Sequence, residues 1–110
     1  MDINQYQKLA ERTANTGQST RDRFINFSFG LAGETGETID YLKKYLFHGH
    51  ELNEEIIAKE LGDILWYISM IATTAGLKMS DVALMNIKKL ADRYPNGFSS
   101  EGSVNRIDKV

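Results

Sequence analysis

Residues 64–71, Ile-Leu-Trp-Tyr-Ile-Ser-Met-Ile, form the stretch that decides the fold. Apolar side chains recur along the chain with a period near 3.6, which favours α-helix. A helix over this stretch would be apolar on nearly every face, and such a helix is buried all round. A chain of 110 residues can enclose only one small core by itself. We therefore predict that this helix lies at an interface between subunits.

The same helical period extends outward from this stretch in both directions. Pro95 is the single proline, so the strongest helix breaker is absent from the positions before it. Ser19 or Thr20 can cap one helix and Asn53 the next through their side-chain oxygens. We expect four helices, over about residues 3–13, 20–47, 54–76 and 80–94. The fold class predicted by this pattern is all-α.

Three features mark the joints of this arrangement. The second helix has a weak zone that predicts either a kink or short break or the close approach of a neighbour: Gly30, Gly33 and Gly36. Met79 and Leu84 are placed to form a hydrophobic staple around a fourth helix that starts at Ser80. Residues 95–110 are expected to be a loop or flexible tail.

These elements predict one domain over residues 1–110, a four-helix subunit. We expect it to complete its core in an intersubunit helical bundle, as a homodimer or as a dimer of dimers, a homotetramer.

Composition excludes several classes of protein. Lys and Arg number 13 against 15 Asp and Glu, and a net charge of −2 lacks the basic excess of a nucleic-acid binder. The absence of cysteine excludes disulfide scaffolds and thiolate-ligated metals. The N-terminus does not resemble a signal peptide, and no apolar run is long enough to span a membrane. We expect a cytoplasmic protein with no membrane and no nucleic-acid partner.

Four acids interrupt apolar helical stripes. Glu34 and Glu37 lie three residues apart in the second predicted helix, and Glu60 and Asp63 lie three apart in the third. Residues at this spacing are neighbours on a helix surface. In an antiparallel hairpin, Glu34 faces Asp63 in the same register in which Glu37 faces Glu60. That register is within about two residues per helix, roughly 3 Å, of the one that a turn near residues 49–52 predicts.

Four carboxylates in one partly buried patch repel one another unless they bind protons or a cation. An all-oxygen ligand set suits Mg²⁺ or Mn²⁺. A di-iron bundle would need Glu-x-x-His motifs, and neither His48 nor His50 has that spacing. Ordinary surface acids on two exposed helices are the remaining alternative.

Two segments, Gly33-Glu34-Thr35-Gly36-Glu37 and Glu60-Leu61-Gly62-Asp63-Ile64-Leu65-Trp66-Tyr67, resemble the MazG-like all-α nucleoside triphosphate pyrophosphohydrolases. The family signature is E-x-x-E, a spacer, then E-x-x-D. The resemblance covers roughly residues 3–98. It includes Tyr6-Gln7 through Arg12-Thr13, similar to the family's opening helix, and a closing run made by Asn86, Lys89, Arg93 and Tyr94-Pro95. This chain differs from many relatives in one position: it has Gly33 directly before the first acid of the motif, where they have a further Glu.

The resemblance implies hydrolysis of an NTP or dNTP to the monophosphate and pyrophosphate, with Mg²⁺ as cofactor and Mn²⁺ as a substitute. It implies that the metal is held by Glu34, Glu37, Glu60 and Asp63. The catalytic candidates are Glu34 and Glu37, one of which would accept the proton of the attacking water.

Asn86, Lys89 and Arg93 share one helix face, which could be a solvated basic face or a cationic arm that grips phosphates. The resemblance favours substrate contacts by these three residues and by Tyr94. Trp66 could stack on the base or belong to the core. The expected role is housekeeping of the nucleotide pool. The alternatives are a dedicated dUTP, dCTP or phosphoribosyl-ATP pyrophosphohydrolase and a non-catalytic helical binding module.

Overall fold

The computed structural model describes residues 1–106 of the chain. Within them the regular structure is helical and no strand forms, which confirms the all-α class. The helices are α1 (Ile3–Glu11), α2 (Thr20–Phe47), α3 (Glu54–Thr74), α4 (Met79–Arg93) and α5 (Ser100–Val104). Arrangement in an intersubunit bundle stays a prediction.

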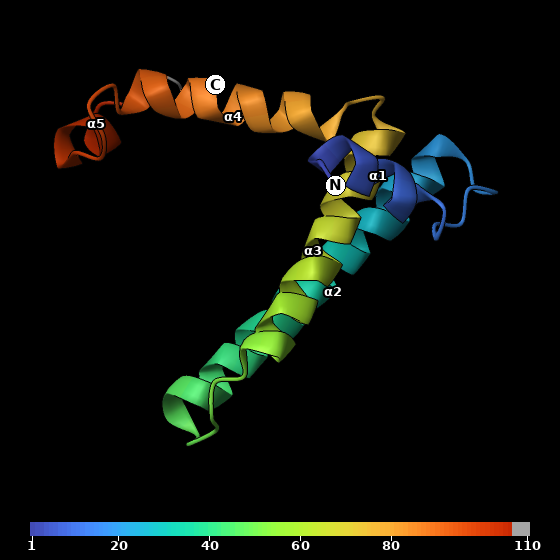
Figure 1. Cartoon of the computed structure of the whole chain (residues 1–110), viewed down its shortest axis with the longest axis horizontal. Helices are drawn as coiled ribbons and strands as arrows, with labels where there is room; N and C mark the ends of the chain where they lie inside the picture. Colours follow the sequence, from blue (N-terminus) through green and yellow to red (C-terminus); the bar gives the residue numbers. More distant parts are fainter. Residues whose placement is uncertain (107–110) are drawn as a thin grey trace.

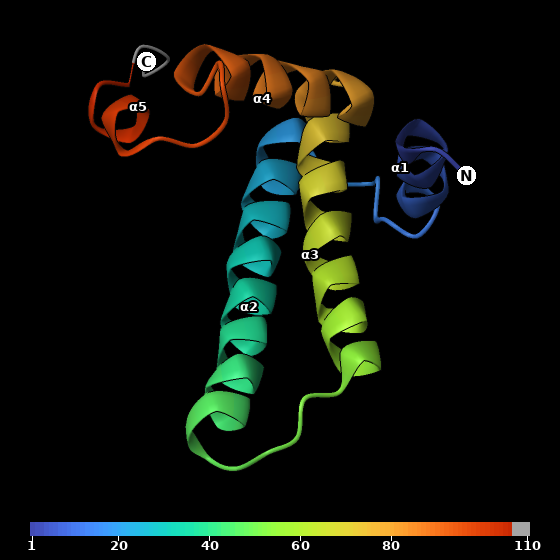
Figure 2. The ribbon, with the colours of Figure 1, turned by 60° about the vertical axis from the view of Figure 1, so that its left-hand side comes forward.

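Long antiparallel helices α2 and α3 form a hairpin, the largest packing unit of the subunit (Figure 1). Figure 2 shows α4 crossing the end of the hairpin where α2 begins and α3 ends, while α1 packs beside α3. The short α5 lies at the far end of α4 (Figure 1). No helix of the described chain is long and apolar enough to cross a membrane.

The hairpin is delimited by the predicted local signals. The Ser19 side chain accepts a hydrogen bond from the backbone N–H of Asp22, and the Asn53 side chain accepts bonds from Glu55 and Ile56. The hydroxyl of Tyr41 accepts the backbone N–H of Asn53 at 2.8 Å, which ties the turn to α2. Both predicted caps of the hairpin are thus confirmed, with Ser19 as the residue that caps α2.

The short break predicted at the glycines of α2 is wrong, because α2 is one continuous helix through all three. The alternative prediction, close approach of a neighbour, holds at Gly30 alone. A Cβ atom there would overlap the ring of Tyr67 on α3, whereas Gly33 and Gly36 face open space. Gly30 therefore lets an aromatic ring lie directly against the α2 backbone, and this contact helps to fix the hairpin register.

Two expectations about the C-terminal half are also wrong. Met79 is the first residue of α4 and is buried, but Leu84 is 58% exposed, so they form no staple. Residues 100–104, expected in a loop or flexible tail, form α5, which is capped by Ser99. Gly102 packs against the backbone carbonyl of Arg93, so α5 docks on the end of α4. The end of that expected tail, residues 107–110, lies outside the described residues.

A small core lies where α1, α2 and α3 meet. Its buried residues are Ala10, Phe27 and Met70, against which pack Tyr6, Ala14, Trp66, Tyr67 and Ile71. Only part of the apolar stretch 64–71 is covered, since Ser69 and Met70 are buried but Ile68 is 37% exposed. Leu61, seven residues before Ile68 on the same helix face, is 53% exposed. One subunit therefore leaves an apolar part of α3 uncovered.

Candidate metal centre

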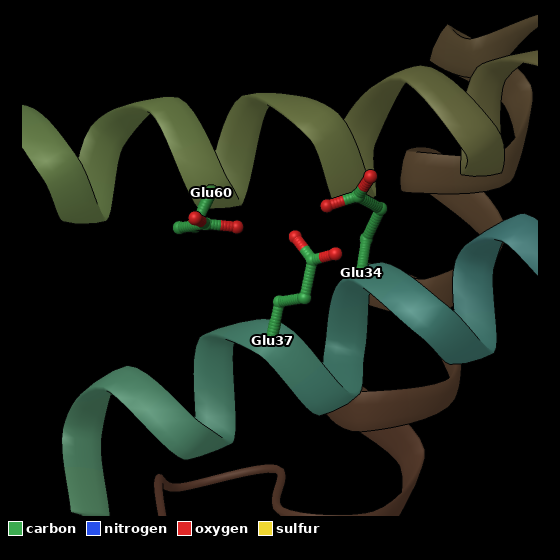
Figure 3. Close-up of side chains that lie close together, drawn as sticks. All are labelled: Glu34, Glu37 and Glu60. Carbon is green, nitrogen blue, oxygen red and sulfur yellow. The ribbon is translucent and has the colours of Figure 1, made fainter. Parts of the chain in front are cut away.

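Three carboxyl groups converge between the two helices of the hairpin (Figure 3). Glu34 and Glu37 project from α2 and Glu60 from α3, and one oxygen of each lies within 4.8 Å of the others. The close contact of Gly30 with Tyr67 lies one turn before Glu34, so α2 and α3 pack tightly next to the acids. The structure thus gathers three of the four predicted metal ligands.

Burial makes this cluster different from surface acids. Glu34 and Glu60 are half-buried, and each has one oxygen, Oε2, that is shielded from solvent without a hydrogen-bond partner. Glu37 is exposed. Buried polar atoms are nearly always hydrogen-bonded, so two unsatisfied oxygens in one cluster require an explanation.

The electrostatics of the cluster point the same way. Burial, followed by the negative charges of Glu37 and Asp63, raises the pKa of Glu34 above its ordinary value. A hydrogen bond with Glu37 and the charge of Glu60 raise this pKa further. Glu34 therefore holds a proton more tightly than a solvated carboxyl group, and a bound cation would relieve the same repulsion.

Nearby lysines are directed to other acids. Lys59, next to Glu60 in sequence, pairs with Glu55 at 3.3 Å, and Lys44 pairs with Asp40 at 2.9 Å. In these ion pairs, neither lysine neutralises the negative charge of Glu34, Glu37 and Glu60.

Asp63, the fourth predicted ligand, is exposed and stands outside the group of three. It lies near enough to act electrostatically on Glu34, whose pKa it raises. It also raises the pKa of Tyr6 on α1, after the larger effect of burial. Tyr6, which packs against the core, thus also lies close enough to Asp63 to feel its charge.

The donor set fits a hard divalent cation. Carboxylate oxygens are preferred by Mg²⁺ and Mn²⁺, and two of those present lack any other partner. His48 and His50 lie in the turn beyond α2 and are exposed, so the group of three contains no histidine. The arrangement does not favour the Glu-x-x-His chemistry of a di-iron bundle.

The predicted substrate residues of the C-terminal half occupy a different part of the subunit. Asn86, Lys89 and Arg93 lie on α4, which extends away from the hairpin (Figure 2). The Arg93 guanidinium lies 5.7 Å from the Tyr94 ring centroid, and Tyr94 packs on Phe98. The structure does not bring this row to the carboxylates of its own hairpin.

Trp66 lies in the core cluster. Its ring meets Phe27 edge to face at 5.8 Å, and its indole N–H donates to the Thr13 hydroxyl at 2.9 Å. This placement accords with the core alternative, while stacking on a base stays a prediction.

The sequence matches the profile of the MazG nucleotide pyrophosphohydrolase domain over residues 26–98. It is also similar to the Gene 37 protein of Mycobacterium phage L5, with 31% identity over 114 residues that cover 96% of this chain and 100% of that protein. No solved structure matches. The chain belongs to the MazG nucleotide pyrophosphohydrolase domain family, a family of hydrolases, and the three clustered glutamates lie within the matched residues.

Proposed function

We propose that this protein is a Mg²⁺-dependent nucleoside triphosphate pyrophosphohydrolase of the cytoplasmic nucleotide pool. It would convert an NTP or dNTP and water to the monophosphate and pyrophosphate, with Mn²⁺ able to replace Mg²⁺. The observation that carries the proposal is the convergence of three glutamates with two shielded, unpartnered oxygens inside the family region.

Glu34, Glu37 and Glu60, with Asp63 beside them, are the residues that would hold the cation. Bound Mg²⁺ supplies positive charge that offsets the triphosphate and the charge developing on the leaving pyrophosphate. The acids themselves hold and move protons. Glu34 or Glu37 accepts the proton released as the water oxygen bonds to phosphorus and the bond to the pyrophosphate oxygen breaks.

The row of Asn86, Lys89 and Arg93, continued by Tyr94, is the proposed phosphate grip. Because α4 turns away from its own hairpin, we propose that the grip acts in a homodimer or homotetramer. A second copy would also cover the apolar side chains of Leu61 and Ile68 that one subunit leaves exposed.

The test is pyrophosphate release from the eight common NTPs and dNTPs, with and without Mg²⁺. We expect metal-dependent release that Glu37→Gln abolishes. Glu55→Gln is the matched control, since Glu55 is an exposed acid at the start of α3 that pairs with Lys59 at 3.3 Å and lies outside the group of three glutamates. Release from one substrate alone would identify a dedicated enzyme. No release from any triphosphate by folded, Mg²⁺-loaded protein would overturn the proposal and favour a binding module.

A further inference from the structure

The turn between α3 and α4 is held by a buried side chain of α1. Gln7, 8% exposed, donates from Nε2 to the Thr73 hydroxyl at 3.0 Å and to the Leu77 carbonyl at 2.8 Å. Its Oε1 accepts the backbone N–H of Met79 at 2.9 Å. One carboxamide therefore joins the end of α3 to the beginning of α4 and uses both of its donors.

Asn4, one turn earlier on α1, makes a second such link. Its Oδ1 accepts the backbone N–H of Ser80 at 3.0 Å, and its Nδ2 donates to the Ser80 hydroxyl at 2.8 Å. The N-cap residue of α4 itself, Lys78, provides no side-chain cap. The first N–H groups of α4, which a local cap would ordinarily satisfy, are thus bonded by side chains from the other end of the chain.

Among the described residues, α4 packs mainly on α1 and on the end of α3, and α5 docks at its far end. Beyond its first turns α4 carries a set of exposed apolar side chains, Leu84, Met85, Ile87 and Leu90. Helix α4 is therefore anchored to α1 and α3 mainly at its N-terminal end, and the rest of the helix projects from that end (Figure 2).

We propose that Gln7 and Asn4 are positioning residues of the hydrolase: they set the direction of α4 and thereby the place of Asn86, Lys89 and Arg93. This inference rests on the proposed function, in which that row grips the phosphates. Neither residue touches substrate, so the effect passes through α4.

The length of α4 explains why a small change of direction at its start should move the phosphate-binding residues by a large distance. Arg93 is 13 positions beyond Ser80, which is about 20 Å along an α-helix. A swing of about 10° at the held end would displace a side chain there by roughly 3.5 Å, by simple geometry on that length. Shifts of about 1 Å can already remove a productive contact with a reacting substrate.

The chain offers a matched control on the same helix. Gln5 is exposed, and its Oε1 accepts the backbone N–H of Asp2 at 2.7 Å in the capping box of α1. Gln5→Met removes a hydrogen bond of α1 that does not reach α4. Gln7→Met removes the bonds that do, and leaves the Leu77 carbonyl and Met79 N–H without a partner.

The experiment measures kcat and KM for the best triphosphate, together with thermal unfolding and amide hydrogen exchange. We expect Gln7→Met to raise KM about tenfold, the effect of losing one charged contact with phosphate. We expect kcat to stay within about threefold, because the carboxylates are untouched. Exchange should accelerate in residues 79–93 of this variant but not of Gln5→Met.

A second pair keeps the test valid if Gln7→Met fails to fold. Asn4→Leu should raise KM in the same direction. Asn4→Asp should leave it near the unaltered value, since the carboxylate still accepts from Ser80 and favours a helix N-terminus.

Equal KM values for Gln7→Met and Gln5→Met, or for Asn4→Leu and Asn4→Asp, would overturn the inference. A loss of kcat that only follows the loss of folded protein would also overturn it, because the role would then be structural alone. No turnover by the unaltered chain would instead overturn the proposed function, and hydrogen exchange would still decide whether Gln7 holds α4.

Discussion

The α2–α3 hairpin and α4 carry the two parts of the proposed site, yet they are held in different ways. The hairpin is delimited by its own caps, Ser19 and Asn53, and its helices contact each other over a long stretch. Helix α4 has no side-chain cap of its own and depends on Asn4 and Gln7. The carboxylate cluster is therefore set by local signals and close packing, and the direction of α4 by long-range hydrogen bonds.

The largest expected effect lies in the hairpin, at the carboxylates. Glu34→Gln and Glu60→Gln should each lower pyrophosphate release by about 100-fold or more, as the loss of a metal ligand does. Without metal, each should melt at or above the temperature of the unaltered protein, because like-charge repulsion is removed. Activity assays and melts in EDTA measure both. Activity retained in either variant would contradict the assignment of the ligands.

The next largest effect tests the packing that sets the hairpin register. Gly30→Ala places a methyl group in the Tyr67 ring and should lower the free energy of unfolding by about 1–3 kcal/mol. Gly33→Ala is the control, since it faces open space and should gain up to about 1 kcal/mol of helix propensity. Urea unfolding compares them. If both variants behaved alike, the register would not depend on the Tyr67 contact.

A substitution at the start of α4 tests whether a local cap can replace the long-range hydrogen bonds from Asn4. Lys78→Asn gives α4 a local cap of the kind that the hairpin helices have, and should stabilise it by up to about 1 kcal/mol. It should also recover part of the KM lost in Asn4→Leu. Thermal melts and KM values of the single and double variants measure this. A double variant no better than Asn4→Leu alone would show that capping and direction are separate properties.

The smallest expected effect is a pH dependence of the hairpin. The pKa of Glu34 is raised in the folded chain by burial and by its acidic neighbours. Below the ordinary carboxyl pKa, Glu34 is protonated in both the folded and the unfolded chain, and its favourable contribution to stability is fully present. As the pH rises from there through the folded-state pKa, the unfolded chain loses this proton first and that contribution is lost.

The metal-free protein should thus become less stable relative to Glu34→Gln as the pH rises from about 4 to 7. Mg²⁺ should abolish the trend. Urea titrations of the two proteins at several pH values measure it. A constant difference across this range would show that Glu34 titrates as an ordinary acid.

The sequence allowed the hairpin and its acids to be predicted because the signals are local or periodic. The caps at Ser19 and Asn53 and the three-residue spacing of Glu34 and Glu37 follow from positions close together in the chain. The placement of Glu60 opposite Glu37, across the two helices, followed from the hairpin register alone. The staple prediction failed because α4 begins at Met79 itself, whose N–H bonds to Gln7, 72 positions away, and because Leu84 is exposed. Helix α5 was missed because residues 100–104 are short and lack an apolar stripe.

The sequence by itself determined the helical class, the extent of the hairpin and the pairs of acids, since helix caps and side-chain periodicity act within a few residues. Only the tertiary structure decided which acids converge, that Gly30 admits the ring of Tyr67, and that α1 fixes α4. Those outcomes depend on side chains distant in sequence filling one space or satisfying one backbone group. Buried polar groups must find partners wherever the fold brings them, and spacing along the chain does not specify the partner.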